Sequence, residues 1–157
     1  MSRTPPSVYE WVGGEPALRA LFKRFYERVA DDALLSPIFA NMDPAHAEHV
    51  AAFVGEVFGG PKHYSERHGG HPAMIRKHLD RALDNDKRKR WIALLLECAD
   101  ELGAPDDPEF RSAFVAYLEW GSRLAVINSA PGVDVTIEAP MPEWGWGDAK
   151  GPYIPET

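Results

Sequence analysis

The sequence predicts an all-α fold followed by an extended C-terminal tail. Apolar residues recur every three or four positions in successive segments, and glycine or proline separates these segments. The last 27 residues, 131–157, hold five prolines and four glycines, a composition that does not sustain a helix. Residues 133–137 alternate like a strand but have no partner strand nearby. We therefore expect a helical domain over residues 1–130 and an appended extension over 131–157.

Two helices are expected at the start of the chain. The first is short, covers residues 8–12, and ends at Gly13-Gly14, because glycine adopts the left-handed conformation without steric cost. Pro16 suits the first turn of the second helix. Apolar residues at helical spacing form one stripe on this helix: Leu18, Leu21, Phe22, Phe25, Tyr26 and Val29. Residues 34–39 are predicted to form a turn or a single helical turn.

A third helix is predicted to begin at Asp43-Pro44, a capping residue followed by a first-turn proline. Its apolar stripe consists of Val50, Phe53, Val54, Val57 and Phe58. Residues 62–70 are rich in glycine, histidine and charged residues, so we expect a loop there. A short helix over residues 72–82 follows.

Two long helices complete the predicted domain, over residues 86–102 and 108–126. The first has an inward face formed by Trp91, Leu94, Leu95 and Cys98. The inward face of the second consists of Phe110, Phe114, Tyr117, Leu118, Gly121 and Leu124. Cys98 is the only cysteine, which excludes an internal disulfide and a thiolate-cluster metal site.

The composition excludes several classes of partner. The chain carries 24 acidic and 17 basic side chains, and the formal net charge of -7 repels nucleic-acid phosphates and anionic lipids. We expect neither nucleic acid nor membrane as a partner. No signal peptide and no apolar run long enough to span a bilayer is visible. The sequence therefore predicts a soluble cytoplasmic domain.

All six histidines lie between residues 46 and 78, which permits three interpretations: scattered surface histidines, a nonhaem metal site, or a haem pocket. His46 and His49 can share a helix face, but no carboxylate at helical spacing in a second helix completes a metal site. Three more histidines lie on a flexible, glycine-bearing segment where coordination is unspecified: His63, His68 and His71.

A haem pocket explains more of this pattern, because haem needs an apolar slot between helices and one neutral imidazole below the iron. His78 follows Met74 and Ile75 on a short helix, where both can lie against a porphyrin face. Large flat walls are available from Phe25, Phe53 and Trp91. Tyr26 adds a hydroxyl on a buried stripe, where it needs a hydrogen-bond partner. For each aromatic residue taken alone, core packing is the commoner explanation.

The order of these residues resembles that of the group II truncated haemoglobins, across roughly residues 7–129. The resemblance rests on Gly13-Gly14, Arg24-Phe25-Tyr26, Phe39, Phe53, Gly59-Gly60-Pro61, Tyr64-Ser65-Glu66, His71-Pro72, His78 and Trp91. It implies a two-over-two sandwich of α-helices around haem b. The tail after residue 130 has no counterpart in the usual family length.

The resemblance also implies roles for single residues. His78 matches the proximal histidine that ligates the iron. Tyr26 matches the distal tyrosine and Trp91 the distal tryptophan, and both donate hydrogen bonds to bound oxygen in the family. Phe39 matches an aromatic position on the haem edge, and Val50 matches a distal position that is apolar here.

Two further positions bear on the pocket. His46 stands where many group II members have Ala, Ser or Thr, so it can donate to bound oxygen, swing outward as a gate, or bind the iron as a sixth ligand; a solvent-facing side chain at the pocket mouth is the alternative. Lys77 precedes the proximal position and is expected to pair with a haem propionate. Gly69-Gly70 stands where relatives tend to have one glycine.

The function expected from these residues is tight binding of O₂ with slow release, and binding of NO, CO, H₂S or peroxide. The alternative is a redox enzyme, an NO dioxygenase or a peroxidase-like protein. It would need an external reductase, because the chain has no flavin or nicotinamide motif. A haem-free helical interaction module is the third class. In the tail, we expect Trp144 and Trp146 to pack against the domain, because exposed tryptophan is costly in water.

Overall fold

The computed structural model of the protein describes residues 4–79 and 81–154, and among them it contains helices and no strand. The helices are α1 (Val8–Val12), α2 (Gly14–Val29), α3 (His46–Val57), α4 (His63–His68), α5 (Gly70–His78), α6 (Asn85–Glu101), α7 (Pro108–Ser129) and the short 3-10 helix η1 (Gly147–Ala149). None of the helices in these ranges is long and apolar enough to cross a membrane.

Local capping explains where several helices begin. Ser7 caps α1 in a reciprocal arrangement with Glu10, in which each side chain binds the other residue's backbone N–H. Asp84 caps α6 by accepting from the Lys87 N–H, and Asp107 caps α7 by accepting from the Phe110 N–H. Ser and Asp are common N-capping residues, so these helix starts can be recognised in the sequence.

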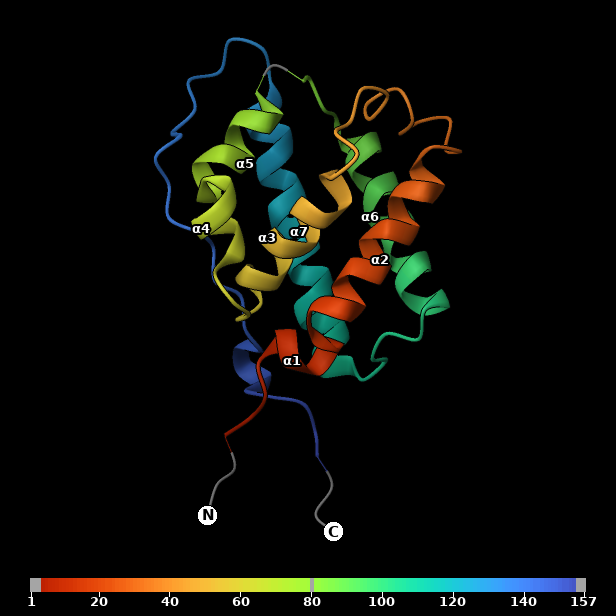
Figure 1. Ribbon diagram of the computed structural model, residues 1–157, viewed down its shortest axis with the longest axis vertical. Helices are drawn as coiled ribbons and strands as arrows, with labels where there is room; N and C mark the ends of the chain where they lie inside the picture. Colours follow the sequence, from red (N-terminus) through yellow and green to blue (C-terminus); the bar gives the residue numbers. More distant parts are fainter. Residues whose placement is uncertain (1–3, 80, 155–157) are drawn as a thin grey trace.

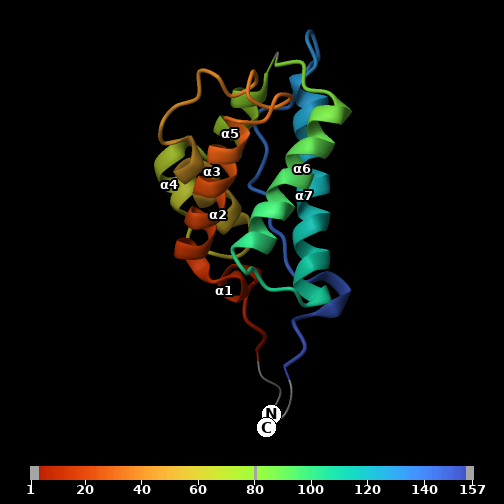
Figure 2. The same ribbon diagram turned by 90° about the vertical axis from the view of Figure 1, so that its right-hand side faces the viewer.

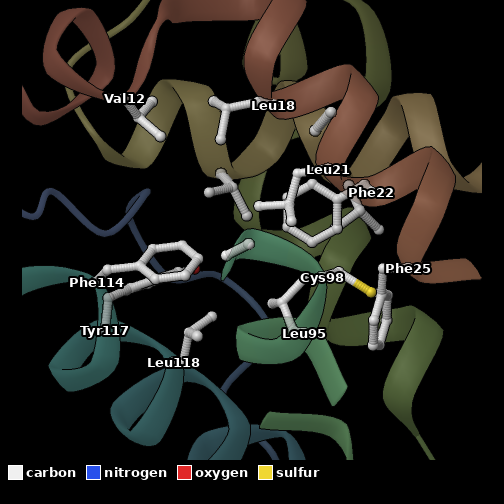
Figure 3. Packing of buried hydrophobic residues seen from close by; sticks show 14 of the residues in the cluster. Val12, Leu18, Leu21, Phe22, Phe25, Leu95, Cys98, Phe114, Tyr117 and Leu118 are labelled. Carbon is white, nitrogen blue, oxygen red and sulfur yellow. The ribbon is translucent and has the colours of Figure 1, made fainter. Parts of the chain in front are cut away.

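The helices form two layers, with α2 and α3 packed together on one side and α6 and α7 on the other (Figures 1 and 2). Figure 3 shows the apolar side chains that fill the space between the layers, including Leu18 and Phe22 of α2, Leu95 and Cys98 of α6, and Phe114 of α7. The predicted all-α sandwich of two helix pairs is confirmed.

The predicted loop over residues 62–70 is wrong, because residues 63–68 form α4. This helix forms because a residue of α3 accepts hydrogen bonds from it. The buried Glu56 carboxylate accepts hydrogen bonds from the backbone N–H of Ser65, at 2.8 Å, and from its hydroxyl, and so satisfies donors in the first turn of α4. No local pattern within residues 62–70 contains this information.

Two predicted helix bounds also shift. The third helix begins at His46 rather than at Asp43-Pro44, because the Asp43 carboxylate accepts from the Ala45 N–H at 2.8 Å and forms a turn ahead of the helix. The predicted helix over residues 72–82 runs instead from Gly70 to His78. Its early end follows from α7, where Ser129 accepts hydrogen bonds from two backbone N–H groups beyond the helix, those of residues 82 and 83.

The C-terminal tail is extended and packs against the helical body. The backbone N–H of Trp144 donates to the Val57 carbonyl at 2.8 Å, and the indole N–H of Trp146 donates to the Pro6 carbonyl at 2.7 Å. The ring of Trp146 lies edge-on to Trp11, with centroids 6.4 Å apart. The predicted packing of both tail tryptophans is confirmed.

Gly60, just after α3, lies so close to its neighbours that the effect of a substitution there can be predicted. A Cβ added at Gly60 would lie 2.7 Å from the Tyr9 ring and 2.8 Å from the Gly55 carbonyl oxygen. We expect Gly60→Ala to lower the free energy of unfolding by about 1–3 kcal/mol, the usual range for overpacking, measured by urea denaturation.

Gly145→Ala is the matched control, because no atom of the described residues lies within 4 Å of its added Cβ. An equal loss of stability in both variants would contradict the steric explanation.

Candidate functional site

A cavity of about 790 Å³ lies between the two helix layers, with walls from α2, α3, α5, α6, α7 and the connection between α2 and α3. It brings together all ten side chains that the sequence predicted for the site: Tyr26, Phe39, His46, Val50, Phe53, Met74, Ile75, Lys77, His78 and Trp91. The lining also includes residues that the sequence did not indicate: His49, His68, His71, Arg81, Tyr117, Trp120 and Pro142.

His78 enters the cavity from the last turn of α5. Its ring Nδ1 lies 2.8 Å from the Met74 carbonyl oxygen, so Nδ1 carries the proton and donates, which leaves the Nε2 lone pair free. Burial lowers the pKa of His78, and the positive charges of Arg81 and Lys77 lower it further, although the bond to Met74 acts in the opposite direction. The ring is therefore neutral at pH 7, the form that binds a metal ion.

On another wall, Tyr26 of α2 meets His46 of α3, with the hydroxyl oxygen and Nε2 3.1 Å apart. Burial lowers the pKa of His46 to about 4, with a smaller contribution from the positive Lys77, so this ring is also neutral at pH 7. Burial raises the pKa of Tyr26, against a smaller lowering by Trp91. The phenol therefore keeps its proton over the physiological range and remains a hydrogen-bond donor.

Aromatic rings pack against one another around Tyr26. The ring of Tyr26 lies edge-on to Phe39 at a centroid distance of 5.4 Å, and Phe25 lies edge-on to Trp91 at 5.5 Å. These contacts position Trp91, which reaches the cavity from α6, on the same side as Tyr26. Val50 is buried and contributes an apolar side chain to the lining. This part of the cavity combines few polar groups with an apolar surround.

Asp32 is a structural residue of the site that sequence reasoning missed. Its carboxylate accepts from the backbone N–H groups of Leu34 and Leu35, at 3.1 and 3.0 Å, and from Arg90 Nε at 2.7 Å. Asp32 thereby ties the turn that leads to Phe39 to the residue before Trp91. Only an aspartate ahead of a turn marks it in the sequence, and nothing there identifies Arg90 as its partner.

Five of the six histidines line the cavity, and His63 lies elsewhere. Within residues 4–79 and 81–154, no group of three or more His, Cys, Asp or Glu side chains is arranged to hold a metal ion, which does not support the nonhaem metal site. The rings of His49 and His68 lie 4.3 Å apart at the cavity lining. His63 lies outside the cavity, in a separate hollow of about 200 Å³ beside α3 and α4. The cavity therefore has no rival metal-binding cluster within those ranges.

The profile of the bacterial-like globin family matches residues 7–120, which is most of the chain. The chain is a bacterial-like globin. It is 34% identical over 123 residues to the group 2 truncated haemoglobin YjbI of Bacillus subtilis, which covers 78% of this globin and 90% of the relative.

Solved structures agree with this assignment. The globin superimposes on the group II truncated haemoglobin of Bacillus anthracis with a TM-score of 0.72, at 26% identity, over 83% of this chain and 97% of the other. For the truncated oxygen-avid haemoglobin of Bacillus subtilis the TM-score is 0.68, at 33% identity, over 77% and 99% of the two chains. The resemblance to group II truncated haemoglobins is confirmed.

Membership in the globin family implies a haem cofactor, and the chemistry of the cavity fits one. The lining is mostly apolar and aromatic, as a porphyrin requires. His78 presents one neutral ring nitrogen, Nε2, which has no hydrogen-bond partner among the described residues and so suits an iron ion. Lys77 and Arg81 supply positive charge beside it, which suits the two carboxylates of the cofactor.

The contacts of Asp32 predict a pH-dependent loss of stability in one variant. Burial opposes ionisation of Asp32, but Arg90 and the N–H groups of Leu35 and Leu34 hold its pKa below the usual aspartate value. We expect Asp32→Asn to lower the free energy of unfolding by about 2 kcal/mol at neutral pH, measured by denaturant titration. The difference in free energy of unfolding between wild type and Asp32→Asn reaches its full size above about pH 5. It shrinks as the pH falls through the lowered pKa, because the wild-type carboxylate then becomes protonated.

Asp31→Asn, at the exposed neighbouring aspartate, is the control for the general effect of removing one negative charge. A difference between wild type and Asp32→Asn that does not shrink in acid would contradict the role given to the charged carboxylate.

Proposed function

We propose that this globin binds haem b in the cavity through His78 and holds O₂ or another diatomic gas on the side of Tyr26 and Trp91. The observation that carries the proposal is the His78 ring, fixed by its bond to Met74 and neutral, in the same cavity as the Tyr26–His46 pair. When bound, haem supplies an iron ion that binds small gaseous ligands reversibly.

The remaining residues hold the cofactor and exclude water. Phe53 and Ile75 are buried at the lining, and Phe39 and Met74 pack against the apolar core beside them. Each removes apolar area from water when the porphyrin is present, at about 25 cal/mol per Å². Lys77 pairs with a propionate at the cavity rim. These five side chains thus contribute to retention of the cofactor.

Tyr26 and Trp91 act on the ligand as hydrogen-bond donors. The phenol stays protonated because it is buried, and the indole N–H does not lose its proton at physiological pH. Donors fixed in an apolar surround stabilise the partial negative charge of bound O₂ by about 1–3 kcal/mol each. Slow release of O₂ follows, a property in keeping with the oxygen-avid relative from Bacillus subtilis.

His46 acts on Tyr26 in this proposal. Its Nε2 lies 3.1 Å from the Tyr26 hydroxyl oxygen, and the two rings are edge-on with centroids 4.9 Å apart. A neutral His46 that donates to the phenol oxygen directs the phenol O–H toward the ligand. This contact favours an orienting role for His46 over the role of sixth iron ligand.

Haem binding through His78 predicts a defined spectroscopic change. We expect the full chain to give a Soret band when supplied with haem, and His78→Ala to lose the ferrous spectrum of an imidazole-ligated iron because the only ring nitrogen offered by α5 at that position is gone. Added imidazole restores the spectrum, because it fills the volume and the ligand position of the missing ring.

His63→Ala is the matched histidine control, because His63 lies outside the cavity. A His78→Ala protein with the wild-type spectrum, or a wild-type chain with no Soret band, would exclude the proposed iron ligation.

Hydrogen bonding by Tyr26 and Trp91 predicts faster release of O₂ when either donor is removed. We expect Tyr26→Phe and Trp91→Phe each to raise the O₂ dissociation rate about tenfold, since the loss of about 1.4 kcal/mol changes a rate or equilibrium constant by that factor. Rapid mixing of the oxygenated protein with excess CO, which replaces O₂ as it dissociates, measures this rate.

Tyr64→Phe is the control, because Tyr64 is buried away from the cavity and its hydroxyl has no hydrogen-bond partner among the described residues. His46→Ala is expected to speed release in wild type and to add nothing in the Tyr26→Phe background. If the increases in the O₂ dissociation rate of the two single variants multiply in the double variant, His46 contacts the ligand independently of Tyr26.

A further inference from the structure

The C-terminal tail returns along the molecule from the far end of α7 and runs beside α5 and α4 toward α1 (Figure 1). Figure 2 shows the same segment between the layer that contains α5 and the layer that contains α7. Because the family profile ends at residue 120, this segment lies outside the part of the chain that matches the globin family.

The tail contacts α5, the helix that carries His78. The ring of His71 is buried, and its Nδ1 lies 2.8 Å from the Pro140 carbonyl oxygen, which accepts the hydrogen bond. His71 and His78 are seven residues apart, so they occupy the same face of α5 two turns from each other. The Arg76–Glu138 ion pair, 3.8 Å long and largely exposed, adds little.

The α5 helix depends on such tertiary contacts. It has nine residues, and its first residue follows Gly69, which provides no side-chain cap. A helix of this length is marginal in water without packing or capping, so its position is determined by what it touches. The bond from His71 to Pro140 therefore fixes the end of α5 opposite to His78.

The tail also supplies part of the cavity wall. Pro142 lines the cavity beside Tyr117 and Trp120 of α7. Two residues later, the Trp144 ring lies 5.6 Å from the rings of both Tyr117 and Trp120. The backbone N–H of Trp144 donates to Val57 at the end of α3, so this point of the tail is held by both helix layers.

From these contacts we propose that residues 138–144 form a strap that completes the haem site: Trp144 anchors it, Pro142 closes the cavity wall, and His71 transmits its position to the helix of His78. The strap slows the loss of haem and sets the geometry of the proximal histidine. This inference rests on the proposed binding of haem. His71 and Trp144 are positioning residues, because neither is assigned a contact with the iron or its ligand.

The test measures haem transfer from the ferric full-length protein to an excess of a haem-free acceptor globin. We expect Trp144→Ala to lose haem about tenfold faster than wild type, and Trp144→Phe to recover most of the wild-type rate because its ring can still pack on Tyr117 and Trp120. His71→Leu keeps the side-chain volume but removes the donor to Pro140, and it is expected to accelerate haem loss as well.

Trp146→Ala is the matched tryptophan control. Trp146 anchors the tail to Pro6 and Trp11 beyond the segment that crosses the cavity, so its loss lowers the melting temperature and leaves the rate of haem transfer unchanged. The iron–histidine stretching band in resonance Raman spectra of the ferrous proteins provides a second readout. It is expected to shift in Trp144→Ala and His71→Leu, and not in Trp146→Ala.

Wild-type rates and bands in Trp144→Ala and His71→Leu, or equal haem loss from Trp144→Ala and Trp146→Ala, would overturn the strap while leaving haem binding intact. A wild-type chain that takes up no haem would overturn both the proposed function and the strap. Accelerated haem loss with unchanged melting of the apoprotein in His71→Leu would support the strap most directly, because it separates retention of the cofactor from general stability.

Discussion

A close-packed protein interior tolerates few voids larger than a water molecule, yet this chain holds a cavity of about 790 Å³ open between its helix layers. Three helices, α3, α6 and α7, meet this constraint in the same way, because one part of each lines the cavity and the rest packs in the core. In α7, Phe110 and Phe114 belong to the core, and the turns from Tyr117 onward line the cavity. The α2 helix packs in the core along its length and lines the cavity only with Tyr26. The packed parts of these helices hold the cavity open.

Burial then determines the charge of the groups inside. Tyr26, His46 and His78 all have pKa values displaced by desolvation toward the neutral form. A neutral imidazole can ligate a metal ion, and a protonated phenol can donate a hydrogen bond. Burial therefore prepares His78 for one of these roles and Tyr26 for the other. Four basic side chains also line the cavity: Lys77, Arg81, Lys87 and Arg88.

Much of this arrangement could be predicted from the sequence, because it is encoded locally or by the order of a few residues. Helical periodicity located the long helices, and the resemblance to group II truncated haemoglobins implied a common pocket for Tyr26, Phe39, Trp91 and His78. What escaped prediction depends on contacts between residues far apart in the chain. The cap that Glu56 gives to α4, 9 positions away, has no local signature.

The same limit applies to Asp32 and Arg90, which are 58 positions apart, and to His71 and Pro140, 69 apart. In each pair an ordinary polar residue acquires its role from a partner that only the folded chain brings close. The partner of His46 belongs to this group too. Its sequence position suggested several roles, and the contact with Tyr26 favours one that was not among them, orientation of the Tyr26 hydroxyl.

The position of the tail has a consequence for the order of assembly. Synthesis proceeds from the N-terminus, and domains generally begin to fold in that order, so α1 to α7 leave the ribosome before residues 138–144 do. Both helix layers and His78 are thus available while one wall of the cavity is still missing. A cofactor that enters at this stage meets an open side, which residues 138–144 close once they have been made.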